Sequence, residues 1–115
     1  MKIIGLILLL ASFSTFANTD TRCGWIFNPT PGNIALIDGE GEWIIGIQRG
    51  YHAKGELTSK VSSDNFIEVN GRYGYYCGCV TGEYLEGAKI VTKIHSDTAQ
   101  PLKVCLQDPD IPSMK

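Results

Sequence analysis

The residues of this chain that could do chemistry are four cysteines and two histidines. Cys77 and Cys79 stand one residue apart in the middle of the chain, and Cys23 and Cys105 lie nearer its two ends. Thiolates are soft ligands, so the central pair could hold copper(I) or zinc with one further ligand. The candidates for that ligand are His52, His95 and Met114. A redox pair is less favoured, because reactive cysteines usually lie at helix N-termini and no helix is predicted here.

Four cysteines in a short exported chain are typical of two structural disulfides. A bond between Cys77 and Cys79 is disfavoured, since both side chains lie on one face of an extended strand. We therefore predict that Cys23 pairs with one cysteine of the central pair and Cys105 with the other, in either arrangement. Structural disulfides leave no free thiolate, so we expect neither a metal site nor a cofactor.

The N-terminus has the pattern of a signal peptide. Lys2 precedes an apolar run at residues 3–10, and small residues follow up to Ala17. A membrane-spanning helix needs about 20 apolar residues, and the run is much shorter. We predict that residues 1–17 are a signal peptide that is removed by cleavage before Asn18. Residues 18–115 are then expected to form a single periplasmic or secreted domain with no membrane span.

Length and net charge limit the classes of function that we expect for this chain. Removing 17 of the 115 residues leaves 98, and the loss of Lys2 leaves nine basic against 12 acidic residues, a net charge of −3. No run of like charges interrupts the sequence. A nucleic-acid-binding domain usually has a basic face, so we expect no nucleic-acid partner.

Short apolar or alternating stretches separated by turn signals recur along the chain. They predict seven strands, at residues 34–37, 42–48, 51–55, 66–69, 73–80, 89–95 and 102–106. Residues 18–22 are polar and expected to fray, and residues 56–64 are expected to form a loop. Along residues 42–48, Trp43, Ile45 and Ile47 share one face and are predicted to lie in the core.

Close turn spacing without a convincing helix predicts an all-β fold. Closure into a barrel removes free sheet edges, so we favour a small Greek-key barrel resembling the oligonucleotide/oligosaccharide-binding fold. A two-sheet β-sandwich is the alternative. Glycines inside the predicted strands, at Gly46, Gly74 and Gly78, suit the bends of a tightly curved sheet.

Aromatic residues are numerous and interleaved with hydrogen-bonding side chains. Such residues can anchor a protein or a sugar ring when exposed. Tyr73 and Tyr75 are expected to pack around the disulfides, whereas Tyr76 and Tyr84 are expected to be more exposed. The predicted candidate binding surface consists of Trp25, Asn28, Arg49, Arg72 and Tyr76.

No catalytic constellation is evident. Ser96 and Asp97 directly follow His95, but a nucleophile, its base and the orienting group usually come from distant segments. The chain also contains no recognisable nucleophile motif. We therefore expect no enzymatic activity.

Several motifs together resemble a family of small exported bacterial proteins known only as a domain of unknown function. They are Arg22-Cys23-Gly24-Trp25, Asn28-Pro29-Thr30-Pro31-Gly32-Asn33 and Tyr73-Gly74-Tyr75 followed by Cys77 and Cys79. The resemblance covers nearly all of the predicted domain and implies a bacterial periplasmic or secreted setting. It implies no activity.

The leading prediction is a non-enzymatic binding module, including inhibitor-like roles, for an unknown protein or glycan of the cell envelope. The alternative is periplasmic copper or zinc handling through Cys77, Cys79 and a histidine.

Overall fold

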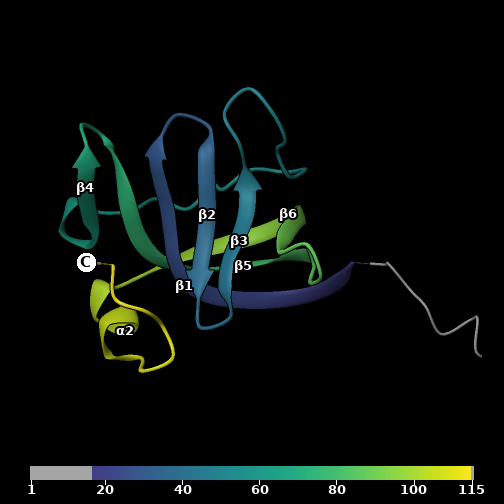
Figure 1. The fold of residues 1–115 in the computed structure, drawn as a ribbon. Coiled ribbons are helices and arrows are strands. Elements are labelled where there is room, and N and C mark those ends of the chain that lie inside the picture. Colours follow the sequence, from purple (N-terminus) through teal and green to yellow (C-terminus); the bar gives the residue numbers. More distant parts are fainter. Residues whose placement is uncertain (1–16, 115) are drawn as a thin grey trace, which may run out of the picture.

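The computed structural model describes residues 17–114 (Figure 1). The predicted signal peptide therefore lies outside the described residues, apart from its last residue, Ala17. Within the described part of the chain, no helix is long and apolar enough to cross a membrane.

Within residues 17–114, six strands and one short α-helix make up the regular structure, with a single turn of 3-10 helix (η1, Ser63–Asn65) before β4. The strands are β1 (Asn18–Thr30), β2 (Asn33–Asp38), β3 (Gly41–Gly46), β4 (Phe66–Asn70), β5 (Tyr73–Leu85) and β6 (Ile90–Gln100), and the helix is α2 (Leu102–Gln107).

The strands form one sheet that closes into a ring. The strand order is β1-β2-β3-β6-β5-β4, and β1 also pairs with β5. The five strands β1, β2, β3, β6 and β5 therefore form a closed ring, and β4 pairs with the part of the β5 edge that β6 leaves free. All pairings are antiparallel except β3 with β6, which meet in parallel at Ile44 and Ile90. The predicted all-β fold, with a small Greek-key barrel and two disulfides, is confirmed, and the two-sheet alternative is not.

β5 is the strand around which the others assemble. It pairs with β1 from Asn18–Tyr84 to Asn28–Gly74, and its other edge holds first β4 and then β6. At Gly74 the neighbouring chain approaches so closely that a Cβ atom would lie 1.8 Å from the Ile67 carbonyl oxygen. Only glycine fits there, so the close approach of β4 to β5 depends on it.

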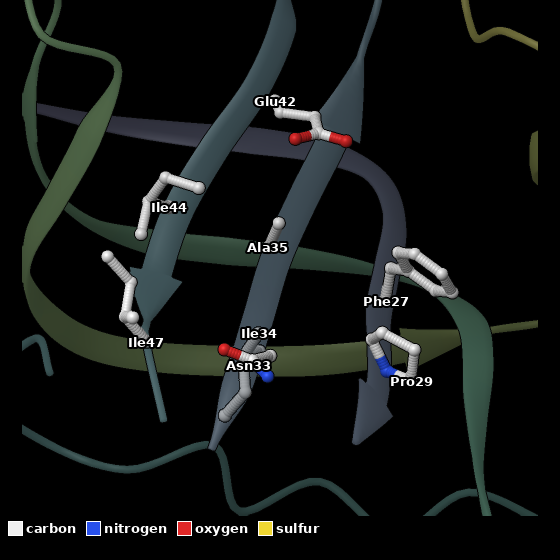
Figure 2. Close-up of a pocket in the computed structure, with 9 residues that line it drawn as sticks. Phe27, Pro29, Asn33, Ile34, Ala35, Glu42, Ile44 and Ile47 are labelled. Atoms are coloured by element: carbon white, nitrogen blue, oxygen red, sulfur yellow. The ribbon is translucent and has the colours of Figure 1, made fainter. Parts of the chain in front are cut away.

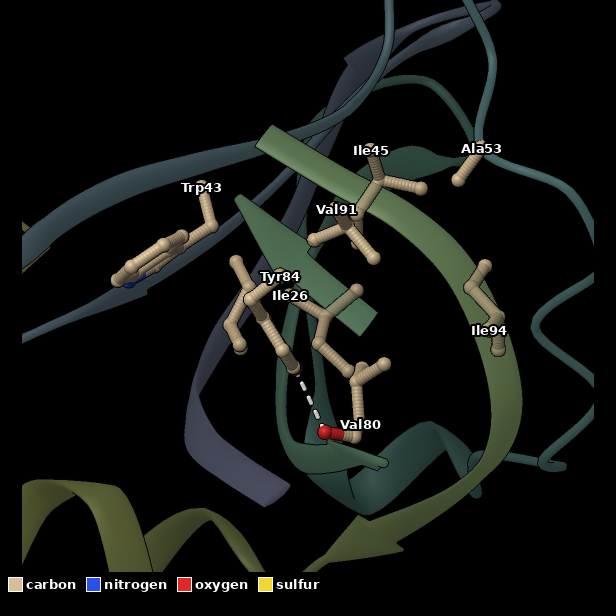
Figure 3. Close-up of a cluster of buried hydrophobic side chains, with 9 residues drawn as sticks. Ile26, Trp43, Ile45, Ala53, Val80, Tyr84, Val91 and Ile94 are labelled. Atoms are coloured by element: carbon tan, nitrogen blue, oxygen red, sulfur yellow. Dashed lines mark hydrogen bonds between the residues drawn. The ribbon is translucent and has the colours of Figure 1, made fainter. Parts of the chain in front are cut away.

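One face of β5 lines the barrel interior. Val80 and Tyr84 point into it, and the Tyr84 hydroxyl donates a hydrogen bond of 2.6 Å to the Val80 carbonyl (Figure 3). The interior is otherwise filled by Ile26, Leu36, Trp43, Ile45, Val91 and Ile94 from the surrounding strands and by Ala53 from the segment between β3 and β4. Tyr84 is only 1 % exposed, so the expectation of an exposed Tyr84 is wrong. Its even-numbered position on β5 selects the inward face.

The opposite face of β5 is covered by the C-terminal segment. Buried Trp25, Cys77 and Cys105 form a second apolar cluster there, with Ile37, Tyr75, Leu102, Ile111 and Met114 packed around it. The Trp25 indole nitrogen donates a 2.8 Å hydrogen bond to the Pro112 carbonyl. We call this the covered patch. Tyr75 packs in it as predicted.

The predicted last strand, residues 102–106, is instead helix α2. Pro101, with φ −60°, is compatible with the start of a helix and cannot donate to a sheet ladder. The helical turn buries Cys105 against β5 while Leu106 remains 70 % exposed. In a strand, the alternating residues Leu102, Val104 and Leu106 would instead have shared one face.

Three strands include residues that the sequence does not predict to lie in strands. Residues 18–22 continue β1, because their backbone pairs with residues 80–84 of β5. Residues 81–85 and 96–100, expected to be loop or turn, likewise belong to β5 and β6. Pairing with the neighbouring strands outweighs the low strand propensity of these polar residues.

Residues 51–55 are not a regular strand, but they close the gap between β3 and β6 through bridges from His52 to Gly46 and from Lys54 to Lys93. Ile47 lies beyond the end of β3 and is 51 % exposed, so its predicted core position is wrong. The chain turns there with Arg49 in the left-handed region at φ 63°. Residues 56–64 are a loop except where η1 begins, largely as predicted.

Candidate binding site at one end of the barrel

An apolar groove of about 190 Å³ lies on the outside of β1, β2 and β3 (Figure 2). We call it the outer groove. Its lining residues are Phe27, Pro29, Asn33, Ile34, Ala35, Glu42, Ile44, Gly46 and Ile47. Figure 2 shows Phe27 and Pro29 along one side, Ile44 and Ile47 along the other, and Glu42 at one end.

Strand register explains why the surface is hollow at this point. Ala35 on β2 pairs directly with Phe27 on β1 and with Ile44 on β3, so one methyl group lies between two large side chains. The three side chains point outward because their neighbours Ile26, Leu36 and Ile45 point into the core. No segment of residues 17–114 fills the hollow.

A second hollow, of about 240 Å³, opens beside the first at the same end of the barrel. We call it the mouth cavity. Its apolar lining is Ile26, Ile34 and Leu57, and its polar lining is Asn28, His52, Glu56 and Tyr76. Ile34 lines both hollows, so groove and cavity are neighbours at the start of β2.

His52 is fixed in the cavity wall by the backbone of β3. It forms a bridge with Gly46, and a Cβ atom at Gly46 would lie only 2.9 Å from the imidazole ring. The ring nitrogen Nδ1 lies 2.6 Å from the Ala53 carbonyl oxygen, so Nδ1 carries the proton. In the neutral ring, the other nitrogen, Nε2, is then a hydrogen-bond acceptor.

The loop that carries Glu56 and Leu57 is tied down by Asp97 of β6. The Asp97 carboxylate accepts hydrogen bonds from the backbone nitrogens of Thr58 (2.8 Å) and Ser59 (3.1 Å). Ser59 Oγ also donates to the Asp97 carbonyl at 2.8 Å. Asp97 therefore positions this wall of the cavity rather than serving His95 as a catalytic partner.

Tyr76 and Asn28 complete the cavity. Burial, with a smaller contribution from the Asp97 charge, raises the pKa of Tyr76 to about 12. The phenol is therefore protonated at neutral pH and is not a general base. The Asn28 amide nitrogen donates to the carbonyls of Thr30 (2.6 Å) and Asn33 (3.0 Å) when the amide is oriented to satisfy them, which leaves its oxygen as an acceptor.

The predicted surface residues are thus only partly brought together. Asn28 and Tyr76 line the mouth cavity, and Arg49 lies in the exposed turn just after Ile47. Arg72 lies in the β4–β5 hairpin, where its guanidinium is 6.0 Å from the Tyr73 ring centre. Trp25 is 2 % exposed within the covered patch, so placing it on a binding surface is wrong. Its side chain is held by Tyr75 and the C-terminal segment.

The other end of β1 and β3 is organised around Arg22. Its guanidinium stacks 4.0 Å above the Trp43 ring and forms ion pairs with Asp38 (3.3 Å) and Glu40 (3.1 Å). Trp43 itself donates to Asp38 at 3.0 Å. These groups pair with one another through charge and ring stacking, whereas the buried Nε of Arg22 has no hydrogen-bond partner among the described residues.

The disulfides join Cys23 to Cys79 and Cys77 to Cys105. All four sulfurs are therefore oxidised. The alternative of copper or zinc handling needs thiolates at Cys77 and Cys79, and these have none to offer. Of the suggested further ligands, His95 forms a 3.2 Å contact with Glu83, His52 lies against the Ala53 carbonyl, and Met114 packs in the covered patch.

Sequence reasoning missed most of the lining. Ile44 alone carries a recognisable signal, because it is a large apolar residue on the face of residues 42–48 opposite Trp43 and Ile45. His52, Glu56 and Leu57 carry no such signal. They meet Tyr76 only through the long loop between β3 and β4.

The chain was compared with protein families, curated proteins and solved structures. No curated protein and no solved structure matches it. The model of one family, described as "Protein of unknown function (DUF4087)", matches residues 17–112. The predicted resemblance to a family of unknown function is thereby confirmed, and this chain belongs to that family.

Proposed function

We propose that this protein is an exported, non-enzymatic binding module that holds an extended segment of a partner protein in the outer groove. The observation that carries the proposal is the apolar trough over Ala35, flanked by Phe27 and Ile44 and open to solvent beside the exposed Ile47. Apolar surface of this kind on the outside of a small barrel often marks an interaction site.

The lining supports a protein segment over a glycan. Sugar rings are commonly bound by flat aromatic faces, and Phe27 is the single aromatic residue among the lining residues. Pro29, Ile44 and Ile47 instead offer the aliphatic contacts that alternate side chains of an extended peptide need. Glu42 at one end provides a charge to orient such a segment.

The same barrel supplies a precedent for this mode of binding. On the covered patch, Ile111 and Met114 of the C-terminal segment pack against the outside of β1 and β5. The groove is adjacent, since Tyr75 contacts both Trp25 of the patch (5.2 Å between ring centres) and Phe27 of the groove (6.2 Å).

Other observations support a binding role outside the cytoplasm. Two disulfides are typical of exported proteins, and the N-terminal pattern is that of a signal peptide. The two histidines each engage a neighbour, Ala53 for His52 and Glu83 for His95, rather than activating a nucleophile.

The test is affinity for a partner identified from envelope extracts, measured with both proteins purified. We expect Ile47→Asp to weaken binding at least tenfold, because it places a carboxylate in the apolar contact. Leu106→Asp is the matched control, since Leu106 is 70 % exposed on α2 outside the groove. Equal affinity of both variants, tighter binding of peptidoglycan fragments than of any protein, or substrate turnover without a partner would contradict the proposal.

A further inference from the structure

The mouth cavity combines an apolar floor with a rim rich in hydrogen-bond acceptors. The floor consists of Ile26, which is 1 % exposed, and the half-buried Ile34 and Leu57. The volume of about 240 Å³ exceeds the roughly 30 Å³ of one water and falls below the roughly 300 to 1,000 Å³ of drug-sized sites. It suits a short aliphatic chain with one polar head.

The rim decides which polar head fits. Glu56 is a carboxylate, the oxygen of Asn28 is left as an acceptor by the bonds of its amide nitrogen, and Nε2 of His52 is an acceptor because Nδ1 donates. Tyr76 adds a hydroxyl and an aromatic ring. The lining contains no Lys or Arg among the described residues. An anion would therefore meet a negative charge and few donors, whereas an ammonium group offers three donors and needs no acceptor.

The walls are preorganised for such a ligand. His52 is set by its bridge to Gly46, and the loop bearing Glu56 and Leu57 is tied to the Asp97 carboxylate. Tyr76 and Ile26 are directly paired across β5 and β1. Little ordering of the backbone that carries these groups remains to be done on binding, which favours affinity.

We propose that the mouth cavity binds a primary alkylammonium group, with its aliphatic chain against Ile26, Ile34 and Leu57 and its nitrogen at the acceptors of Glu56, Asn28 and His52. Two sources share this chemistry. One is a lysine side chain of a protein segment, which could reach the cavity from the outer groove past Ile34. The other is a free aliphatic amine or diamine.

The test is a methyl NMR titration of the purified domain with n-hexylammonium, the neutral n-hexanol and the anionic hexanoate. We expect saturable shifts of the Ile34 and Leu57 methyl groups with n-hexylammonium, and at least tenfold weaker binding of the other two probes. Equal binding of n-hexanol, tighter binding of hexanoate, or no saturable shift with n-hexylammonium would overturn the proposal.

Variants locate the charge that selects the ligand. Glu56→Gln should weaken n-hexylammonium binding about tenfold, because it removes the carboxylate at the rim. Glu42→Gln is the matched control, an exposed carboxylate of the outer groove that does not line the cavity. An equal loss in both variants would show a general charge effect and overturn the assignment.

Two further probes separate the sources. Binding of Nα-acetyl-lysine N-methylamide as tightly as n-hexylammonium supports a lysine side chain, and preference for 1,6-diaminohexane supports a free amine. The Ile47→Asp variant keeps this test distinct from that of the outer groove. It should weaken partner binding at least tenfold while n-hexylammonium affinity stays unchanged, so failure of either proposal can be seen separately.

Discussion

Two apolar areas lie side by side on the outside of this barrel, and they differ in what covers them. The covered patch around Trp25 and Cys77 lies beneath the protein's own C-terminal segment, whereas no part of residues 17–114 covers the outer groove around Ala35. Tyr75 and Phe27, with ring centres 6.2 Å apart, mark the boundary. The covered patch shows that this sheet surface can hold an apolar segment, and the outer groove offers a surface of similar chemistry that is open to solvent in the described structure.

The largest expected difference between the two areas concerns stability. Trp25→Ala should lower the free energy of unfolding by roughly 3 to 5 kcal/mol, the usual cost of truncating a buried aromatic residue. Phe27→Ala, in the half-buried wall of the groove, should cost less than half of that. Urea unfolding of both variants measures the difference. Equal losses would mean that the two areas contribute alike to the fold.

The next-largest expected difference between the covered patch and the outer groove concerns the disulfides. Replacing either pair by alanine should cost roughly 3 to 4 kcal/mol by loop entropy, since the bonds span 28 and 56 residues. Only the loss of Cys77–Cys105 should release the C-terminal segment, because Cys23 and Cys79 face each other within the continuous β1–β5 pairing. Proteolysis of residues 101–114 under native conditions measures this release.

In the Cys23→Ala/Cys79→Ala variant, that segment should stay protected. Early cleavage there as well would show that the segment depends on both bonds rather than on its own packing.

The smallest expected effect is on the groove itself. Ile47→Asp should change the free energy of unfolding by no more than about 0.5 kcal/mol, because an exposed side chain contributes little to stability. Thermal unfolding compared with Leu106→Asp checks this. A loss above 2 kcal/mol would mean that Ile47 is structural after all.

Much of the fold could be predicted from the sequence, for physical reasons that differ along the chain. The turns at Asp38-Gly39 and Asn70-Gly71 and the alternation in residues 73–80 are local signals, and they correctly place β2 to β5. The cysteine positions correctly predict that Cys77 and Cys79 each bond to a cysteine nearer one end of the chain. Which of the two bonds to Cys105 depends on which face of β5 carries α2. That is a tertiary property.

The errors have a common cause in long-range contacts. Residues 18–22 look frayed because their partners on β5 lie about 60 positions away. Residues 102–106 alternate like a strand, but after Pro101 they fold as a helix that packs Cys105 against Cys77 on one face of β5. Ile47 fits the core pattern of Trp43 and Ile45 until the chain turns one residue earlier.

The candidate site could be predicted least. Asn28 and Tyr76 were identified as polar and aromatic residues near a turn or on a strand, and they do line one cavity. Arg49 and Arg72 lie in separate turns, and Trp25 is buried. The groove forms because Ala35 is small where its paired neighbours on β1 and β3 are large. Predicting it would require the strand register, which the sequence does not provide.

The most direct test of the groove as the binding surface is site-specific photo-cross-linking in cells. A photoreactive amino acid would be placed at Ile47 in the groove, or at Leu106 on α2 as an equally accessible control. We predict one discrete protein adduct from position 47 and none from position 106. The same adduct from both positions, or an adduct from position 106 alone, would contradict the assignment of the groove as the surface that binds the partner.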